Sequence, residues 1–186
     1  MTSTYLFLLW IIALIMGGYK EEILLDFSDR DEIPEWLIIN DEVMGGVSSS
    51  DLEYIPAGYL KFTGNVSLEN NGGFASFRTQ SRTFDLTDYD GIKIRIRGDG
   101  KKYSFRLKTG NSYNDIAYAA DFKSRKESWQ EVEIPFNDFT PRYRGRIILD
   151  AEEIDRSGIR QLGFLIADNQ EGAFALEIDW IKAYSY

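Results

Sequence analysis

The sequence of 186 residues contains no cysteine and no histidine. Without cysteine it can form no disulfide, thiolate metal site or thiol nucleophile. Without histidine it lacks the commonest general base and the commonest ligand of transition metals. Catalytic triads that depend on either residue are therefore impossible, and a bound metal would need oxygen ligands, as calcium and magnesium do. We expect a protein that is not an enzyme and that carries no cofactor.

Proline is scarce, with 4 residues, whereas hydrophobic residues make up 44% and aromatic residues 15% of the chain. This composition is typical of one globular domain with a core of its own. Positive charge is also in short supply: the chain has 21 Lys and Arg but 30 Asp and Glu, which gives a net charge of −9. An acidic protein repels phosphate backbones and anionic lipids, so we expect no nucleic-acid partner.

Residues 1–18 contain no charged side chain, and an unbroken apolar run extends from Tyr5 to Met16. As a helix this run rises about 18 Å, which is short of the roughly 30 Å that spans a bilayer. It favours an apolar leader, either a signal peptide or a membrane tether, ahead of a single domain over residues 19–186. We therefore expect an exported or membrane-tethered protein that contacts membrane only through the leader. A buried first element and an intracellular location are the alternative.

After the leader, hydrophobic residues recur with a period of two, which is typical of β-strands. Glycine and asparagine clusters separate the short segments, and no segment of a dozen residues has the pattern of an amphipathic helix. We expect an all-β jelly-roll sandwich with two antiparallel sheets and at most short helical turns. The expected strands are Ile23–Phe27, Tyr59–Thr63, Val66–Glu69, Phe74–Thr79, Ile116–Lys123, Trp129–Ile134, Gln161–Ala167 and Phe174–Tyr184. Asn137–Gly158 is expected to be a long loop with one helical turn.

Two further alternating segments, Ile92–Arg97 and Tyr103–Lys108, flank Gly98–Lys101. The Asp-Gly pair in this connection favours a tight turn, so we predict that the two segments form a hairpin. If their hydrophobic residues face the core, their cations line the opposite face. This predicted basic face comprises Lys93, Arg95, Arg97, Arg106 and Lys108, and Arg78 joins it if Phe74–Thr79 lies in the same sheet.

The predicted basic face would suit an anionic glycan, a nucleotide-like ligand or an acidic segment of a protein partner. Asp121 or Glu133 could instead neutralise it, since most runs of charge coat solvated faces. Rings of Tyr113, Tyr118, Tyr143 or Trp129 could form a platform for sugars, although each could equally belong to the core.

The segment Asn40–Ser48 reads Asn-Asp-Glu-Val-Met-Gly-Gly-Val-Ser. It resembles the Asn-Asp-x-Val-Met-Gly-Gly-x-Ser signature of the complex I intermediate-associated protein 30 family. The resemblance continues through Phe62-x-Gly64, Asn71–Arg78, Tyr89–Gly91, Arg97–Gly100, Tyr103, Ile134–Phe136, Phe139, Arg144-Gly145, Gly163, Asp168, Gly172-x-Phe174 and Leu176-x-Ile178. It covers the chain from about residue 23 to the C-terminus.

The resemblance implies a galactose-binding-domain-like jelly roll, similar to several carbohydrate-binding modules. It also implies a chaperone-like assembly factor for respiratory complex I, with no established enzymatic residues. We therefore expect a noncatalytic binding or assembly-factor domain that acts through protein–protein contacts, with a membrane complex subunit as a candidate partner. An extracytoplasmic carbohydrate-binding module is the alternative.

The signature offers candidate binding residues, with polar acceptors and glycines that allow close approach of a ligand. An architectural role is the alternative, since Asx turns and glycine bulges shape tight corners of a sandwich. The candidates are Asn40, Asp41, Met44, Gly45, Gly46, Ser48 and Arg78. We expect Met44 to fill the core rather than to contact a ligand.

Three aspartates near the start of the domain, Asp26, Asp29 and Asp31, loosely resemble a calcium cluster. Their spacing lacks the fixed glycine and terminal glutamate of an EF-hand loop, so a solvated turn is the preferred interpretation. We predict no metal site.

Overall fold

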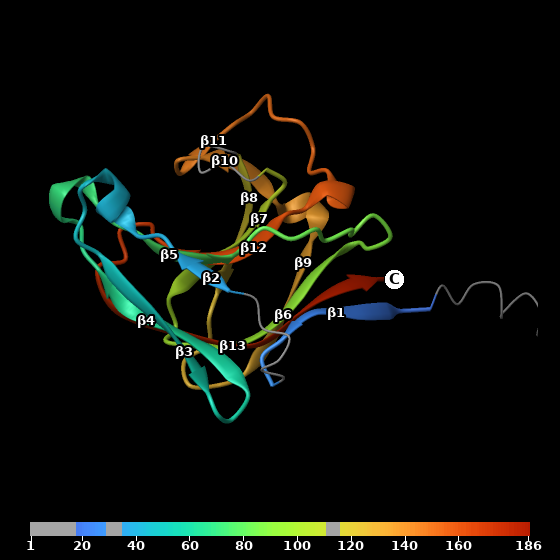
Figure 1. Cartoon of the computed structure of the whole chain (residues 1–186), viewed down its shortest axis with the longest axis horizontal. Helices are drawn as coiled ribbons and strands as arrows, with labels where there is room; N and C mark the ends of the chain where they lie inside the picture. Colours follow the sequence, from blue (N-terminus) through green and yellow to red (C-terminus); the bar gives the residue numbers. More distant parts are fainter. Residues whose placement is uncertain (1–17, 29–34, 111–115) are drawn as a thin grey trace, which may run out of the picture.

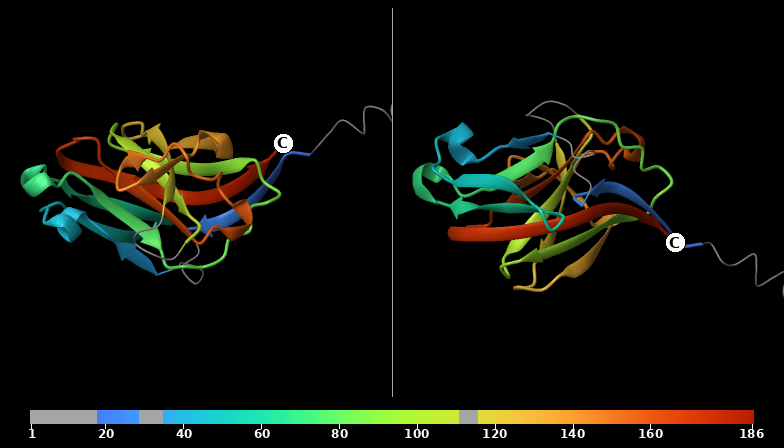
Figure 2. Two further views of the ribbon diagram at one scale, coloured as in Figure 1. Left: turned by 90° about the horizontal axis from the view of Figure 1, so that it is seen from above. Right: turned by 60° about the horizontal axis from the view of Figure 1, so that its bottom comes forward.

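The computed structural model describes residues 18–28, 35–110 and 116–186. These residues form two antiparallel sheets that pack face to face, joined by loops and short 3-10 turns (Figure 1 and Figure 2). The predicted all-β sandwich is therefore confirmed. The 3-10 turns are η2 (Asp41–Met44), η3 (Glu69–Asn71), η4 (Phe136–Asp138) and η5 (Arg156–Gly158). No helix in the described ranges is long and apolar enough to cross a membrane. The leader lies outside those ranges.

The first sheet is built around β13, the longest strand of the fold. β13 pairs with β6 along one edge, and its other edge is shared between β4 and β1. The strand order is β3-β4-β13-β6-β9, with β1 beside β13. The strands are β1 (Lys20–Asp26), β3 (Ser49–Ile55), β4 (Tyr59–Val66), β6 (Gly91–Gly98), β9 (Gln130–Pro135) and β13 (Gly172–Ser185).

The second sheet lies across the core from the first and carries the remaining strands. Its order is β11-β10-β8-β7-β12-β5-β2, so that β12 lies between β7 and β5. The strands are β2 (Trp36–Ile38), β5 (Ala75–Thr79), β7 (Lys102–Lys108), β8 (Ala117–Lys123), β10 (Thr140–Tyr143), β11 (Arg146–Ile147) and β12 (Gln161–Ile166).

Aromatic side chains join the two sheets in the core. The ring of Phe62 from β4 lies 4.7 Å from the ring of Phe77 on β5, and Phe77 stacks on Phe164 of β12 at 5.5 Å. All three side chains are almost fully buried. Burial of each is worth about 1.5–3 kcal/mol, and this gain is available only if alternate residues of each strand face the same side. The period-two pattern thus produces the sandwich.

The predicted hairpin between Ile92–Arg97 and Tyr103–Lys108 is wrong. β6 pairs with β13 and β9 in the first sheet, whereas β7 pairs with β8 and β12 in the second. The turn between them crosses from one sheet to the other and is held by Ser124, whose Oγ accepts a hydrogen bond from the N–H of Gly100 at 3.0 Å. Because both inner faces need alternating hydrophobic residues, the pattern is the same for a hairpin and for a crossover.

The prediction for Asn137–Gly158 was also incomplete. This segment contains β10 and β11, which extend the second sheet beyond β8, and η5 begins near its end. The strands were not predicted, because Pro141 and the exposed Ile147 do not fit the pattern of a strand with one hydrophobic face. An edge strand needs no continuous hydrophobic face and tolerates proline. The strand β3 was likewise not predicted.

Candidate binding site

Asp41, in the signature motif, is fully buried and joins two loops. Its carboxylate accepts hydrogen bonds from the backbone N–H groups of Ser48 at 2.9 Å, Gly73 at 2.6 Å and Phe74 at 3.2 Å. The first of these residues follows η2 and the other two precede β5. The charge of Asp41 therefore ties the loop between β2 and β3 to the loop between β4 and β5.

Burial opposes the charged form of Asp41, but the hydrogen bonds from Ser48, Gly73 and Phe74 outweigh it and hold the pKa below its ordinary value. The neighbouring Asn40 is also buried, and its Oδ1 accepts a hydrogen bond from the hydroxyl of Ser50 at 2.7 Å. These polar groups of the signature form hydrogen bonds within the protein, as the architectural interpretation expects.

Glycine is required beside this carboxylate. Gly45 has a φ of 90°, in the left-handed region, and a Cβ on Gly46 would lie 2.4 Å from Cγ of Asp41. The two glycines let the chain turn tightly around the buried charge. They shape the loop that follows η2.

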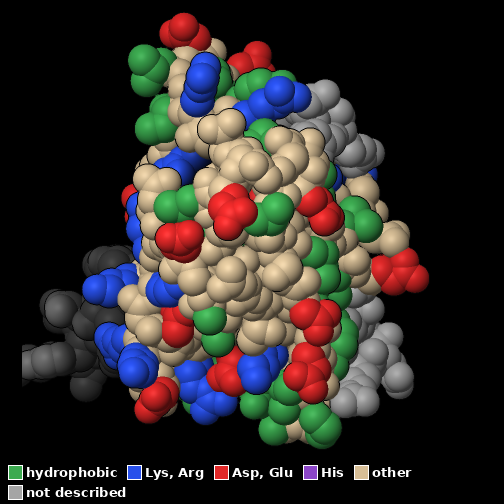
Figure 3. Space-filling model, turned by 90° about the vertical axis from the view of Figure 1, so that its left-hand side faces the viewer, with side chains coloured by type: hydrophobic (Ala, Val, Ile, Leu, Met, Phe, Trp, Pro, Cys, Tyr) green, Lys and Arg blue, Asp and Glu red, His purple; other side chains and the backbone are tan. Residues whose placement is uncertain are grey.

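The same loop exposes apolar side chains. Val43, Met44 and Val47 are 53%, 54% and 51% exposed. The prediction that Met44 fills the core was therefore wrong, because η2 turns Asp41 inward and is buried at that residue alone. Figure 3 shows the face of the molecule that lies on the left of Figure 1, with hydrophobic and acidic side chains interspersed at its centre.

The predicted basic face is divided between the two outer surfaces of the sandwich, because β6 and β7 lie in different sheets. On the first sheet, Lys93 forms ion pairs with Glu21 at 3.2 Å, Glu131 at 3.1 Å and Glu133 at 3.3 Å. Burial of the ammonium opposes its charge, but the hydrogen bond with Tyr19 and the contacts with these carboxylates outweigh burial and raise the pKa of Lys93. On this sheet the cations are neutralised, in part by the Glu133 that the sequence had suggested.

The two arginines of β6 are paired in the same way. Arg95 contacts Asp179, and Arg97 contacts Glu177, its register partner on β13. Both guanidinium groups also lie over the ring of Trp129, at 5.1 Å and 4.8 Å from its centroid. The first sheet thus carries an ordered network of charge and aromatic contacts.

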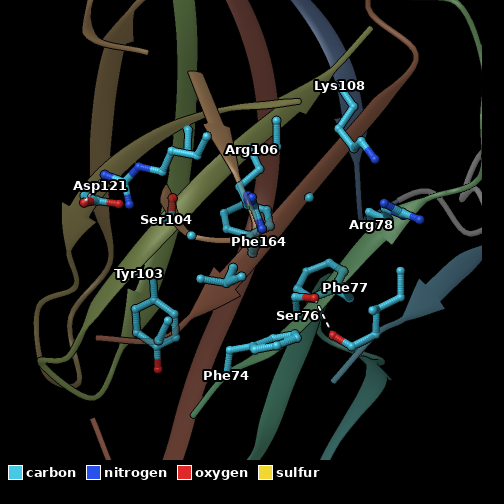
Figure 4. Close-up of a pocket in the computed structure, with 18 of the residues that line it drawn as sticks. Phe74, Ser76, Phe77, Arg78, Tyr103, Ser104, Arg106, Lys108, Asp121 and Phe164 are labelled. Atoms are coloured by element: carbon cyan, nitrogen blue, oxygen red, sulfur yellow. Dashed lines mark hydrogen bonds and ion pairs between the residues drawn. The ribbon is translucent and has the colours of Figure 1, made fainter. Parts of the chain in front are cut away.

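The outer face of the second sheet carries a pocket of about 240 Å³. Small residues on β8 and β12, which flank β7, are part of its lining: Ala117, Ala119 and Gly163. Arg78, Arg106 and Lys108 all line it, so these three predicted cations come together, joined by β12 rather than by a hairpin. Figure 4 shows Lys108 at one end of this pocket and Phe74 and Tyr103 toward the other.

Gly163 determines the geometry between two of these cations. It is the register partner of Arg78 on one side and of Arg106 on the other. A Cβ on Gly163 would lie 2.8 Å from Cβ of Arg78 and 2.4 Å from the carbonyl oxygen of Phe77. Two strand spacings separate the arginines by about 10 Å at the backbone, and the glycine lets β5 approach β12 closely.

The described residues that line the pocket carry more positive than negative charge. The cations are Arg78, Lys102, Arg106, Lys108, Arg142 and Arg144, and the anions are Asp121 and Asp168. Asp121 pairs with Lys102 and with Arg142, each at 3.0 Å. Burial opposes its charge, but these two cations outweigh burial and lower its pKa.

Two buried polar side chains in the pocket are incompletely satisfied. Ser104 and Gln161 are 5% and 3% exposed. Within the described ranges, the Oγ of Ser104 and the Oε1 of Gln161 have no hydrogen-bond partner. An unsatisfied buried polar group costs about 1–3 kcal/mol, so each atom would gain from a ligand group that replaced the missing partner. Sequence reasoning missed both residues, because single polar residues in hydrophobic strands carry no distinctive signal.

The other sequence candidates do not gather at this pocket as a set. Asp29, Asp31 and Tyr113 lie outside the described residues, and Asp26 accepts hydrogen bonds from the N–H and hydroxyl of Ser28. Among the described residues, no group of three acidic side chains is placed to hold a metal. Of the aromatic candidates, Tyr143 lines the pocket, whereas Tyr118 is buried and Trp129 lies on the first sheet.

The sandwich is similar to carbohydrate-binding modules. The family 11 module of the Clostridium thermocellum cellulase Lic26A-Cel5E matches with a TM-score of 0.68 and 20% identity, over 91% of this chain and 97% of the module. A structure of the family 11 module in complex with a β-1,3-1,4-mixed-linked tetrasaccharide gives a TM-score of 0.67 and 21% identity, over 89% and 95%. At these identities the likeness shows the fold.

Sequence comparison identifies the family. The family model described as Complex I intermediate-associated protein 30 matches residues 25–178, and the chain belongs to this family. The Drosophila melanogaster protein of that name is 28% identical over 90% of this chain and 64% of its own length. An uncharacterized Schizosaccharomyces pombe protein is 33% identical, over 78% of this chain and 75% of its own length.

The mouse Complex I intermediate-associated protein 30 is 22% identical, over 89% of this chain and 57% of its own length. The chain thus spans less than two thirds of the fly and mouse relatives. Both relatives are named as mitochondrial proteins, and export of this chain receives no support from the comparisons.

Proposed function

We propose that this chain is a noncatalytic binding domain of an assembly factor, and that it binds a protein partner through the pocket on the second sheet. The observation that carries the proposal is the pocket on the outer face of the second sheet, whose described lining includes six Lys and Arg side chains. Charged side chains around a binding site orient a partner of complementary charge. The family supports an intermediate of respiratory complex I as the source of that partner.

The chemistry of the site supports binding rather than catalysis. Its charged groups are arginines, lysines and two aspartates. Asp121 pairs with Lys102 and Arg142, and Asp168 pairs with Lys102. General acid–base catalysis needs a group that changes protonation near neutral pH, and the chain has no histidine to provide one. Among the described residues that line the pocket, none is an activated nucleophile.

A carbohydrate ligand is the second candidate, because the family 11 module of similar fold has a structure in complex with a β-1,3-1,4-mixed-linked tetrasaccharide. Tyr143 at the pocket could stack on a sugar ring. A neutral glycan, however, makes no use of six cations. Binding that falls steeply with added salt supports the protein partner, and binding to neutral mixed-linked glucan that ignores salt supports the carbohydrate.

The test compares Arg106→Ser with Arg125→Ser in affinity purification from mitochondria of the source organism. Arg125 is an exposed arginine outside the pocket, so its replacement removes the same charge elsewhere. We expect wild type and Arg125→Ser to retain complex I subunits and Arg106→Ser to lose them, with equal melting temperatures. Equal recovery of those subunits by both variants, or by none of the three proteins, would overturn the proposal.

A further inference from the structure

The strand β3 forms one edge of the first sheet (Figure 1). It is seven residues long, and among the described strands it pairs with β4 alone. Because β4 occupies only one side of it, alternate backbone N–H and C=O groups of β3 point away from the sheet. We propose that a partner protein adds a strand to this edge, and that the added strand alternates Lys or Arg with aliphatic residues. This surface is separate from the pocket on the second sheet.

The outer face of β3 carries two carboxylates. Asp51 and Glu53 are exposed, and they share a face because they are two positions apart on the strand. The ion pairs and hydrogen bonds of the described residues include neither carboxylate, although Lys61 is the register partner of Glu53 on β4. A strand added on the other side of β3 would place its own side chains directly opposite these two carboxylates. Cations at those positions would be attracted to them.

The inner face of β3 is apolar and incompletely covered. Leu52 is the register partner of Phe62, and Tyr54 is the register partner of Leu60. Both partners on β4 are fully buried in the core, whereas Leu52 and Tyr54 pack against the core but are only partly buried. Aliphatic side chains from an added strand would extend the inner face and remove these residues from water.

The edge strand of the second sheet, β2, lies across from this opening. Trp36 of β2 donates a hydrogen bond from its indole N–H to the hydroxyl of Tyr54 at 2.5 Å. Two residues further along, Ile38 is the register partner of the buried Phe77, so its side chain is on the inner face of its sheet. Ile38 is nevertheless 40% exposed. Aliphatic side chains of both sheets, Ile38 and Leu52, are therefore left for an added strand to cover.

A second copy of the chain does not suit this edge. In an antiparallel pair of two β3 strands centred on Leu52, Asp51 of each chain would lie opposite Glu53 of the other. Like charges directly opposite one another destabilise a strand pair, and charged edge strands protect proteins from edge-to-edge association. The same two carboxylates attract a cationic strand. The charge of the edge therefore selects a basic partner.

The probe is the peptide Ser-Val-Lys-Val-Lys-Val-Ser with blocked ends. One companion replaces both lysines by glutamate, and another carries a methyl group on every backbone nitrogen. The test variant is Asp51→Asn with Glu53→Gln. The matched control is Asp150→Asn with Glu152→Gln, which removes the same charges at the same spacing from exposed positions after β11. Titration calorimetry measures affinity for the whole chain, and NMR measures hydrogen exchange of its backbone amides.

We expect the lysine peptide to bind and to slow hydrogen exchange at the alternate amides of β3 that do not bond to β4. The glutamate companion should bind about tenfold more weakly, and the methylated companion should not bind, because it cannot donate to the ladder. The Asp51→Asn and Glu53→Gln protein should bind the lysine peptide about tenfold more weakly than wild type, since it loses two cross-strand charge pairs. The control variant and Arg106→Ser should bind it as wild type does.

Equal affinity of wild type and the Asp51→Asn and Glu53→Gln protein would overturn the basic partner. Absence of binding, equal affinity of the methylated companion, or protection of other strands in place of β3 would overturn strand addition. Protection of β3 that needs no peptide and rises with protein concentration would assign the edge to a second copy and would also overturn the proposal. None of these results bears on the proposed function, because Arg106 lies on the other sheet.

Discussion

The carboxylate of Asp41 accepts a hydrogen bond from the backbone N–H of Gly73 at 2.6 Å, although the two residues are 32 positions apart in the chain. This contact brings the loop after β2 against the loop before β5. Met44 belongs to the first loop and Phe74 to the second, so one buried charge brings together two loops that line the pocket. Within the signature motif, Asp41 is therefore buried and holds the loops in place, whereas Met44 is exposed.

Replacement of Asp41 by Asn should destabilise the domain by about 2–4 kcal/mol, because the amide must present an NH₂ group where the carboxylate accepts hydrogen bonds. Urea denaturation at pH 7 measures the effect. Glu42→Gln removes the charge of the exposed neighbour and should change stability by less than about 0.5 kcal/mol. Equal stability of the two variants would show that the hydrogen bonds of Asp41 contribute little.

The strand alternation was sufficient to predict β1, β5, β8, β9, β12 and β13 near their observed positions. It could not assign strands to sheets, since Ile92, Ile94 and Ile96 would face a core equally well in a hairpin or in opposing sheets. The sheet to which a strand belongs depends on which other strands it pairs with. Here β6 pairs with the long β13, and β7 pairs with β12.

The candidate site was predicted only in part, because strand alternation does not show which strands share a sheet. Arg78, Arg106 and Lys108 were named from their alternation, and they do lie together, but Lys93, Arg95 and Arg97 lie on the other sheet. Gly163 and Met44 gain their place in the pocket from contacts between strands and loops distant in sequence. No local pattern encodes such contacts, so a single sequence could not reveal them.

Acid should loosen the attachment of β1 to the first sheet. The hydrogen bond from Lys182, assisted by Tyr19 and Lys93, lowers the pKa of Glu21 from 4.5 to about 2. A depressed native pKa means that the stabilisation is complete above pH 4.5 and is lost as pH falls toward 2. Glu21→Gln should therefore be less stable than wild type at pH 7, and the difference should vanish near pH 2.

Denaturation curves between pH 7 and pH 2, at low and at high salt, measure this difference. Salt should reduce it, because Glu21 and Lys182 are each 23% exposed at the side chain. A difference in stability between wild type and Glu21→Gln that stayed constant with pH would contradict the assignment of this stabilisation to the ionised carboxylate of Glu21.

Removal of a first-sheet arginine should affect local packing but not partner binding. Arg97→Ser deletes the ion pair with Glu177 and the guanidinium over Trp129. We expect a loss of stability of about 1 kcal/mol and a shift in tryptophan fluorescence, since one partly exposed ion pair and one cation–π contact are worth that much together. Recovery of complex I subunits should equal that of wild type. A loss as large as that expected for Arg106→Ser would place the binding surface on the first sheet instead.

The leader can be tested by mass spectrometry of the natural N-terminus. If residues 1–18 act as a cleaved targeting segment, the mature chain should begin near Tyr19, at the start of the domain. A membrane tether would keep the full chain and place it in the membrane fraction. A soluble mature chain that begins at Met1 would contradict both forms of the leader.

The close approach of β5 to β12 gives a final prediction at Gly163. A Cβ there would lie 2.4 Å from the carbonyl oxygen of Phe77, so Gly163→Ala must push β5 away from β12. We expect a loss of about 1–3 kcal/mol of stability, as overpacking of a close contact causes. Because β5 carries Arg78, recovery of complex I subunits in the affinity purification should fall in parallel. Gly18→Ala is the control, since a Cβ at Gly18 meets nothing within 4 Å. Unchanged stability and recovery in Gly163→Ala would show that the spacing between Arg78 and Arg106 does not depend on this glycine.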